Sequence, residues 1–373
     1  MNWLLYTFIT IFGTLFRFFP LPCRIGIVKI GNPNRNSPVL LTCNFCLTVS
    51  RVKRSLGGLD AYLLIANSRG INVWCAATGG LFTNHDVISI LKVSGIEELV
   101  DHRKVILPQL AGTGIEAKTI RAKTGWHIIW GPVYAQDIPE FLRSGLKKDN
   151  SMRKTKFDFV QRIEMAIAWA FMISFILSLV LFFVWRNAIM MMIIFVWTIS
   201  LLLFLAFPLY QKLFQISKSF GTRGFQLASW VFVMSGLMGY HFFIHSFTWG
   251  AAFRWGILLT LVVLAITIDI LGCTPTFKSG FHRDRLLKIV LDESKCQGDG
   301  TCAEVCPRHC FEIYRIKNVA KIECCENCVQ CGACIVQCPY DALYFQSPKG
   351  EIITAELIRK YKLNLIGERI VEI

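Results

Sequence analysis

DAYLLIANSRGINVWCAATGG, residues 60–80, decides the fold of the amino-terminal part of the chain. Its first half, Asp60–Asn67, is a short apolar run that ends at a polar and glycine-containing turn, which indicates a strand buried on both faces. Ser37–Asn44 is a similar run before it, and Lys104–Leu107 and His127–Trp130 are two more after it. The pattern therefore predicts four buried strands.

Helical patterns separate these strands at Val49–Ser55, Asn84–Lys92 and Ile115–Lys123. Strands that alternate with helices predict a parallel sheet, with a ligand at the carboxyl ends of the strands. The sequence contains no G-x-G-x-x-G and no Walker sequence, so nucleotide binding has no support. We predict an α/β domain of the Rossmann-like type over residues 24–146.

The segment after the second predicted strand holds a single cysteine. Trp74 and Cys75 lead into a short Ala-Ala helix that Gly79 and Gly80 end. A cysteine in such a place is more often a small buried residue than a ligand. The pattern alone leaves both interpretations open.

The middle of the chain is strongly apolar. Hydrophobic residues make up 54% of the whole sequence and charged residues only 17%, below the roughly 25% of a soluble globular protein. Since a bilayer core requires about 20 apolar residues per helix, we predict a four-helix transmembrane domain within residues 160–275. The spans are expected near residues 165–185, 188–210, 225–247 and 255–273.

The first 23 residues form a separate hydrophobic segment. Its apolar run has only 16 residues before Arg17, a length between that of a membrane span and that of an interfacial segment. An interfacial anchor and a fifth span both remain open.

Positive charge gathers at one side of the predicted spans. The formal net charge is +15, and basic residues precede the first span, at Lys147, Lys148, Arg153, Lys154, Lys156 and Arg162. By the positive-inside rule this places both large polar parts in the cytoplasm, on a multi-pass protein of the cytoplasmic membrane. Membrane lipid is therefore the expected partner of this charge, and no nucleic-acid fold motif accompanies it.

The carboxy-terminal part carries an iron–sulfur pattern. Residues 296–338 contain ten cysteines, and four of them form C-x2-C-x2-C-x3-C before Pro339: Cys328, Cys331, Cys334 and Cys338. This is the run of bacterial dicluster ferredoxins, in which the fourth thiolate binds the other cluster. An upstream run repeats the spacing with Cys296, Cys302 and Cys306 before Pro307, and Asp299 stands where its second cysteine would be.

The two runs predict two clusters in an α+β ferredoxin domain over residues 288–347, followed by a tail at 348–373. One cluster is expected on Cys306, Cys328, Cys331 and Cys334, and the other on Cys296, Cys302 and Cys338 with Asp299 as a possible fourth ligand. Because a carboxylate is a harder ligand than a thiolate, the second site fits either a [4Fe–4S] cluster with an oxygen ligand or a [3Fe–4S] cluster. The interlocking runs disfavour structural zinc and disulfides.

Three thiols of this part are surplus to the two clusters: Cys310, Cys324 and Cys325. Small buried residues are one interpretation. A site for soft metals, centred on the adjacent pair Cys324-Cys325, is the other, because thiolates select soft cations.

The motif NVWCAA at Asn72–Ala77 resembles the cap helix of HgcA, the corrinoid protein family of microbial mercury methylation, which is related to the large subunit of the corrinoid iron–sulfur protein. The similarity extends over roughly residues 25–145 and includes SPVLLTCN, VILPQL and the GPV that begins at Gly131. In that family a membrane domain follows the corrinoid domain, as here. Residues 290–345 are similar to the family's dicluster ferredoxin partner, HgcB, so the chain resembles a fusion of the two.

The resemblance implies roles for particular residues. Cys75 would coordinate cobalt of a cobalamin-type corrinoid, and two sets of residues would lie near the ring: Asn72, Val73, Trp74, Ala76 and Ala77 of the cap helix, and Leu107, Pro108 and Gln109 of a loop. It also implies membrane-bound, corrinoid-dependent methyl transfer, as in mercury(II) methylation, with cobalt reduction by the fused ferredoxin. The implied partners are a methyl donor protein or a methyl-folate-type donor, and a low-potential electron donor.

Three features depart from the family pattern. Thr78–Asn84 reads TGGLFTN and lacks the family's lysine, the chain ends in GERIVEI without a paired-cysteine tail, and Asp299 replaces a cysteine. Two alternatives therefore stand beside mercury methylation. One is a corrinoid methyltransferase with another acceptor, such as a different soft metal, a metalloid or a C1-pathway thiol. The other is a membrane electron-transfer iron–sulfur protein without methyl chemistry.

Overall fold

The computed structural model describes residues 2–373 except 217–219, 245–247, 269–286, 315, 365–366 and 371–373, and it describes no side chains for 212–226, 267–268, 361–364 and 367–370. The chain divides into two compact units. The first joins Met1–Lys156 to Leu287–Ile373, and the second is Phe157–Leu286. The predicted α/β and ferredoxin domains therefore lie in one unit, and the predicted transmembrane domain forms the other.

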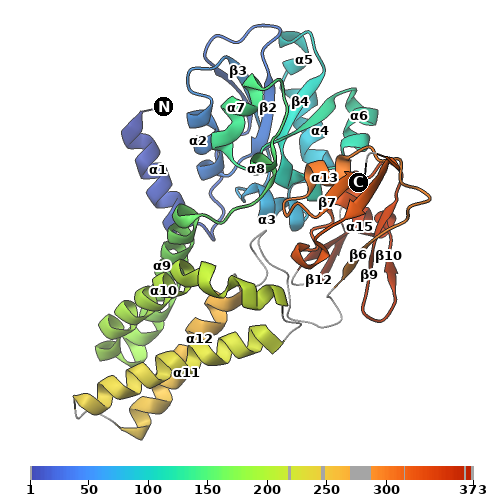
Figure 1. The fold of residues 1–373 in the computed structure, drawn as a ribbon. Helices are drawn as coiled ribbons and strands as arrows, with labels where there is room; N and C mark the ends of the chain where they lie inside the picture. The colour runs from blue at the N-terminus through green and yellow to red at the C-terminus, as the bar shows by residue number, and fades with distance from the viewer. Residues whose placement is uncertain are drawn as a thin grey trace. The chain divides into compact units, whose positions relative to one another are not determined.

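A five-stranded sheet organises the amino-terminal part of the first unit (Figure 1). Its order is β1-β3-β2-β4-β5, and the strands are β1 Gly26–Ile30, β2 Val39–Cys43, β3 Ala61–Ala66, β4 Lys104–Pro108 and β5 His127–Gly131. The last four are parallel, which confirms the predicted parallel sheet. β1 is an additional, antiparallel edge strand that pairs with β3.

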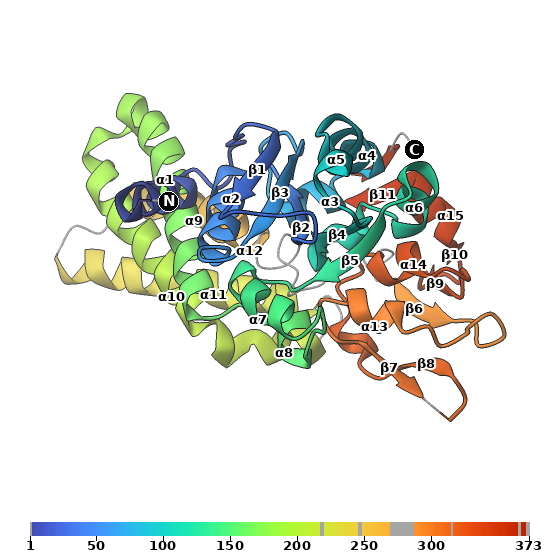
Figure 2. The ribbon, with the colours of Figure 1, turned by 90° about the horizontal axis from the view of Figure 1, so that it is seen from above.

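Helices cover both faces of this sheet (Figure 2). Alternate strand residues point to opposite faces, so Leu40 and Leu63 belong to one core while Leu41 and Leu64 belong to the other. The helices on the first face are α2 Cys46–Ser55, α7 Ile138–Arg143 and α8 Asn150–Arg153, and those on the second are α4 Asn84–Val93 and α6 Ala117–Thr124. The result is the predicted layered α/β domain.

The amino-terminal helix α1, Trp3–Leu15, packs beside α2 in the same unit. The guanidinium of Arg54 lies 4.2 Å from the ring centre of Tyr6. The helix has 13 residues, fewer than the roughly 20 that a span requires, and Trp3 and Phe8 are exposed. The two interpretations of this segment, an interfacial anchor and a fifth span, both stay predictions.

The ferredoxin part has an α+β arrangement. Strands β6 Lys288–Leu291, β9 Leu343–Gln346 and β10 Ile352–Ile353 form one antiparallel sheet, and β7 Phe311–Tyr314 and β8 Val319–Ile322 form a hairpin. Two short helices, α13 Thr301–Val305 and α14 Ala333–Gln337, pack together. The remaining elements are η6 Cys325–Asn327, α15 Ala355–Lys360 and the pair β11 Tyr361–Asn364 and β12 Gly367–Ile370. The buried residues of this part are continuous with one core of the α/β domain.

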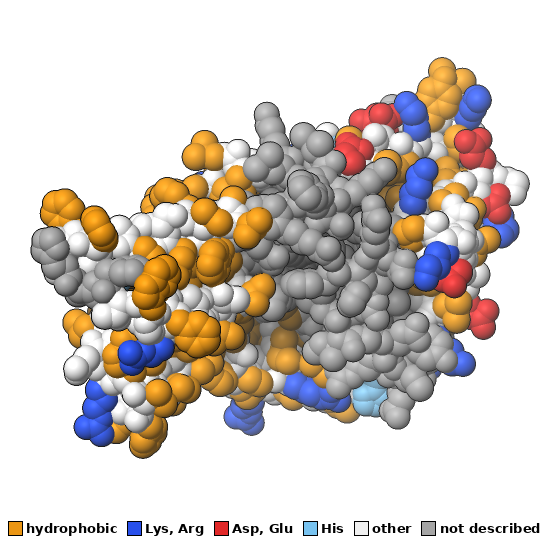
Figure 3. Space-filling model, turned by 90° about the horizontal axis from the view of Figure 1, so that it is seen from below, with side chains coloured by type: hydrophobic (Ala, Val, Ile, Leu, Met, Phe, Trp, Pro, Cys, Tyr) orange, Lys and Arg blue, Asp and Glu red, His pale blue; other side chains and the backbone are white. Residues whose placement is uncertain are grey.

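The second unit is helical, with α9 Phe159–Val184, α10 Ile189–Ile216, α11 Phe220–Phe243 and α12 Trp249–Ile268. Three stretches are long and apolar enough to cross a membrane: Phe159–Val184, Arg186–Gln211 and Trp249–Ile266. The span expected near 225–247 falls on α11, and residues 245–247 lie outside the described part, as do residues 269–273 of the last expected span. Figure 3 shows many apolar side chains on the surface that the helices form.

We expect the sheet core to dominate the stability of the first unit. Leu64→Ala removes a fully buried side chain and should lower the free energy of unfolding by about 2–5 kcal/mol. Val93 is 78% exposed, so Val93→Ala should change it by less than about 0.5 kcal/mol. Thermal unfolding in detergent, followed by tryptophan fluorescence, measures both, and equal effects of the two variants would contradict this assignment of the core.

Candidate functional site

Cys75 lies on a short helix at the carboxyl edge of the sheet. This helix, α3 Val73–Thr78, follows β3, and Asn72 caps it by accepting a 3.0 Å hydrogen bond from the Cys75 amide at Oδ1. Cys75 is exposed, whereas Ala76 and Ala77 are fully buried. The helix therefore packs through its alanines and presents the thiol to the outside, at the edge where ligands bind in α/β folds.

The other residues of the motif NVWCAA flank Cys75 in the sequence. Val73 is buried, and Asn72 and Trp74 are half-buried. The hydroxyl of Thr78 donates a 2.8 Å hydrogen bond to the Trp74 carbonyl, and α3 ends at Gly79. The predicted short helix and its end are thus confirmed.

A buried side chain after β2 holds the loop that leads into α3. Asn44 Oδ1 accepts hydrogen bonds of 2.9 Å from the amides of Ser68 and Gly70, and the Ser68 hydroxyl lies at the same distance. That hydroxyl also lies 2.7 Å from the Ile71 carbonyl. One amide oxygen therefore fixes Ser68 and Gly70 in the loop before the cap helix, and no pattern in the sequence marks it.

Gly70 is required in this loop by its conformation and by its surroundings. Its φ is +72°, which a side chain disfavours, and a Cβ would lie 2.6 Å from the Pro22 nitrogen. Its carbonyl accepts a 2.9 Å hydrogen bond from the Leu21 amide. The chain before β1 is thereby attached to the loop that carries Cys75.

The end of β4 and the 3-10 helix that follows it lie on the interior side of the cap helix. Leu107 is fully buried in the core and Pro108 is half-buried. Gln109 is buried, donates a 2.9 Å hydrogen bond to the Arg153 carbonyl and accepts one of 3.0 Å from Lys148 Nζ. Gln109 begins the 3-10 helix η1, Gln109–Thr113, which packs against α3. These residues therefore support the cap helix from the protein interior.

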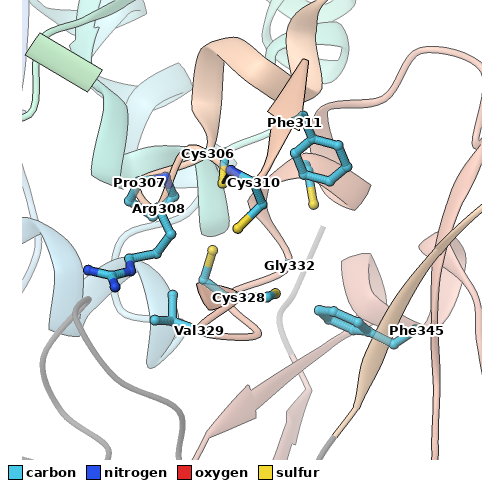
Figure 4. A pocket seen from close by; sticks show the side chains of 11 residues that line it. Cys306, Pro307, Arg308, Cys310, Phe311, Cys328, Val329, Gly332 and Phe345 are labelled. Atoms are coloured by element: carbon cyan, nitrogen blue, oxygen red, sulfur yellow. Dashed lines mark hydrogen bonds between the residues drawn. The ribbon is translucent and has the colours of Figure 1, made fainter. Parts of the chain in front are cut away.

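One predicted cluster set lines a single cavity in the ferredoxin part. Cys306, Cys328, Cys331 and Cys334 all line one cavity, together with Cys310 (Figure 4). The Cys310 amide donates a 3.3 Å hydrogen bond to Cys306 Sγ, and the Gln330 amide donates one of 3.4 Å to Cys328 Sγ. Burial raises the pKa of Cys331 and of Cys334. Buried thiols that share one cavity and receive backbone N–H groups suit an iron–sulfur cluster, which binds them as thiolates.

Cys310 is a fifth thiol of this cavity that the sequence analysis left unassigned. It is buried, and it forms side-chain hydrogen bonds with Cys306 and with Cys328. The hydrogen bond from Cys310 lowers the pKa of Cys306 to about 7, and the same contact raises the pKa of Cys310. Cys310 therefore adds a fifth sulfur to the four predicted ligands, and its position four residues after Cys306 is the signal for it in the sequence.

The second predicted set gathers around Cys302. Burial is the main reason that the pKa of Cys302 rises to about 12, and the nearby charges of Asp299, Cys296 and Cys338 add to it. The amides of Ala320 and Ala342 donate hydrogen bonds of 3.3 Å and 3.4 Å to the sulfurs of Cys296 and Cys338. The Asp299 carboxylate also accepts a hydrogen bond from Thr301. Asp299 therefore lies close enough to Cys302 to raise its pKa, and its role as a fourth ligand stays a prediction.

Two observations limit other metal assignments. Among the residues that the structure describes, no three His, Cys, Asp or Glu side chains surround a single metal-ion position. Cys324 is half-buried and Cys325 is exposed, and neither lines the cavity of the cluster cysteines. The adjacent pair lies on and beside η6, immediately before Cys328.

We expect the Asn44 amide to stabilise the cap loop. Asn44→Ala leaves buried N–H groups of Ser68 and Gly70 without their acceptor, which should cost about 1–3 kcal/mol and increase hydrogen exchange of residues 68–76. Thermal unfolding and exchange of the full chain measure the two effects. The exposed Asn36 provides the matched control, Asn36→Ala, and an Asn44 variant that behaves like this control would contradict the role.

Comparison with known proteins identifies relatives of both parts. The family model described as CO dehydrogenase/acetyl-CoA synthase delta subunit matches residues 19–142, and the 4Fe-4S binding domain model matches residues 289–312 and 326–344. The acetyl-CoA decarbonylase/synthase complex subunit gamma of Methanopyrus kandleri is 35% identical over 126 residues, which cover 33% of this chain and 27% of that protein.

Two further relatives match the same part of the chain. The subunit gamma 2 of Methanosarcina mazei is 42% identical over 127 residues, 33% of this chain and 27% of that protein. The corrinoid/iron-sulfur protein large subunit of Moorella thermoacetica is 30% identical over 129 residues, 34% of this chain and 28% of that protein. This chain thus spans about a quarter of the length of these relatives. It joins a domain of the corrinoid iron–sulfur protein large-subunit type to a 4Fe-4S ferredoxin domain.

Proposed function

We propose that this chain carries out corrinoid-dependent methyl transfer and that its own ferredoxin domain supplies the electrons. The observation that carries the proposal is the exposed thiol of Cys75, on a capped helix at the ligand edge of a domain similar to corrinoid proteins. A corrinoid bound there would supply a cobalt centre that carries the methyl group. Sulfur is a soft ligand, which suits a transition metal of this kind.

The residues around Cys75 fit a flat cofactor laid over α3. Ala76 and Ala77 have the smallest side chains that a helix favours and are buried, so α3 lies close against the protein. Asn72 fixes the first turn, and Asn44 fixes the loop before it. The sulfur is therefore held on a rigid support, which lowers the entropy lost when it binds a metal. A thiolate is also a strong electron donor, which favours transfer of the methyl group as a carbanion-like species.

The ferredoxin domain provides the second part of this function. The four predicted ligands of its first cluster line one cavity. At the second site Asp299, Cys296 and Cys338 lie near Cys302. Iron–sulfur clusters accept single electrons, and the potential of a cluster depends on its ligands, on hydrogen bonds to sulfur and on burial. We propose two clusters that pass electrons from an external low-potential donor to the corrinoid. The site with Asp299 would hold a cluster of different composition or stability.

We propose that the helical unit spans the cytoplasmic membrane. Apolar side chains on its helices are exposed, among them Phe175, Phe183 and Ile194, and such surfaces are stable in lipid rather than in water. Four spans, the three long apolar helices and α11, would return both ends of the unit to the cytoplasmic side. Exposed Lys147, Lys154 and Lys156 support this orientation, whereas the side chain of Lys148, another basic residue before the first span, is buried in the first unit.

Mercury(II) is the methyl acceptor that we propose first, on the resemblance of NVWCAA to the cap helix of the mercury-methylation family. A thiophilic cation requires thiols near its entry path, and the half-buried Cys324 and the exposed Cys325 have the suitable chemistry. A different soft metal, a metalloid or a thiol remains the alternative acceptor. The methyl donor would be a protein or a methyl-folate-type molecule.

The substitution Cys75→Ala tests the proposal. Anaerobically purified wild-type protein should contain cobalt and iron and should form methylmercury from a methyl donor, mercury(II) and a low-potential reductant. In Cys75→Ala methyl transfer should fall to background, because no thiolate remains to hold the metal, while the iron content stays unchanged. Cys46→Ala changes another thiol of the same domain and should behave like wild type.

The assay also separates the alternatives. Wild-type-like methyl transfer by Cys75→Ala would contradict the role of this thiol. Methyl transfer to thiols or other metals, without formation of methylmercury, would show that mercury(II) is not the acceptor. The proposed corrinoid chemistry and electron delivery would remain unchanged. If wild-type protein contained iron but no cobalt, the result would support the alternative function, a membrane electron-transfer iron–sulfur protein without methyl chemistry.

A further inference from the structure

One short stretch, Gln109–Ile115, lies between the cap helix and the ferredoxin domain; we call it the bridging segment. Gln337, the residue before the cluster ligand Cys338, inserts its side-chain amide against it. Its Nε2 donates a 2.7 Å hydrogen bond to the Gly112 carbonyl and another to the Ile115 carbonyl. Its Oε1 accepts one of 3.1 Å from the Ala117 amide. The side chain is buried, so the contact excludes water.

The opposite side of the bridging segment contacts α3. A Cβ on Gly114 would lie 2.8 Å from the Ala77 carbonyl oxygen and 2.9 Å from the Ala77 Cα. Only glycine allows so close an approach. The route from the cluster ligand Cys338 to the cap helix therefore has three steps. They are the peptide bond to Gln337, the hydrogen bonds of Gln337 to the bridging segment, and the backbone contact of that segment with Ala77.

A buried lysine forms a second contact between the two domains. Its side chain is 2% exposed, and Lys148 Nζ donates hydrogen bonds to Gln109 Oε1 at 3.0 Å, to the Gly131 carbonyl at 3.3 Å and to the Glu304 carbonyl at 3.1 Å. Glu304 lies on α13, between the cluster ligands Cys302 and Cys306. Lys148 thus connects the ends of β4 and β5 with a cluster-binding helix.

Two further polar contacts join the same two domains, in addition to those of Gln337 and Lys148. Arg359 Nε is 3.0 Å from Glu116 Oε1, and the same guanidinium is 2.6 Å from Asp341 Oδ1. The Thr155 amide donates a 3.0 Å hydrogen bond to the carbonyl of Pro307, which follows Cys306. Each of the two Cys-Pro runs is therefore held against the α/β domain, and the cores of the two domains are continuous.

We propose that the bridging segment, Lys148, Glu116 and Thr155 form a permanent docking site for the chain's own ferredoxin domain. Gln337 is the positioning residue that couples the clusters to the cap helix. The docking rests on the contacts above, and its role in electron delivery rests on the proposed function. A reduced cluster would give each electron to the group held at Cys75, and an external low-potential donor would reduce the cluster again. Because the face around Gln337 is occupied, that donor must bind the ferredoxin domain elsewhere.

Hydrogen exchange of the detergent-solubilised, iron-loaded full chain tests the docking. In wild type the Ala117 amide should be protected, and Gln337→Ala should increase its exchange by about tenfold, because the amide loses its acceptor. Gln346→Ala, on β9, is the matched control and should leave it unchanged. Iron content and visible absorption identify any variant that has lost a cluster. For such a variant, Glu116→Gln gives the same test from the α/β side, with increased exchange of residues around Arg359 expected.

The electron route has its own measurement. After flash reduction of the clusters, electron transfer to the cobalt centre should be first order and independent of protein concentration, and Gln337→Ala should slow it by about tenfold or more. Unprotected Ala117 in wild type, or a rate proportional to protein concentration, would overturn the permanent docking. Absence of cobalt would overturn the proposed function and leave the exchange result to decide the docking by itself.

Discussion

The amide oxygen of Asn44 is the point on which the arrangement of the cap helix depends. It lies at the end of the central strand β2 and accepts hydrogen bonds from the loop that follows the neighbouring strand β3. Because parallel strands end at the same edge, an acceptor on one strand can fix the loop of the next. That loop contains Gly70 and ends at Asn72, so the direction of α3 and the exposure of Cys75 follow from one buried side chain.

The ferredoxin part follows a different constraint, because its function depends on sulfur atoms from distant positions. Cys306 joins three cysteines that lie more than twenty residues later, and Cys338 joins the earlier run. Neither set can form until both Cys-Pro runs have folded together. The α13 and α14 helices that carry these ligands pack against each other, and their outer ends contact the α/β domain through Glu304 and Gln337.

Much of this architecture could be predicted from the sequence, and the exceptions have physical reasons. Buried strands and regular cysteine spacing are local signals, so the four parallel strands, the short helix of Cys75 and the gathering of Cys306, Cys328, Cys331 and Cys334 around one cavity were predicted. The ligands of the second cluster stay a prediction. The edge strand β1 was missed because its residues are only half-buried and lack a continuous apolar run. Asn44 and Gln337 act through partners that are distant in the sequence, and no local pattern marks a polar residue that will be buried. Cys310 was left unassigned because it lies outside the regular spacing of the two cysteine runs. Lys148 shows the reverse error, since a basic residue near a membrane helix is ordinarily solvated.

The first compact unit is discontinuous, because the helical unit separates its two parts by 130 residues, Phe157–Leu286. During synthesis the α/β domain leaves the ribosome first, and the four helices must be released before the ferredoxin strands follow. Until then Gly112, Ile115 and Lys148 have no partners from the ferredoxin part, and an apolar surface continuous with the domain core is open to water. The nascent protein therefore passes through a stage in which this surface has no partner, and exposed apolar surface of this kind promotes aggregation. Cluster assembly also waits until both Cys-Pro runs have left the ribosome.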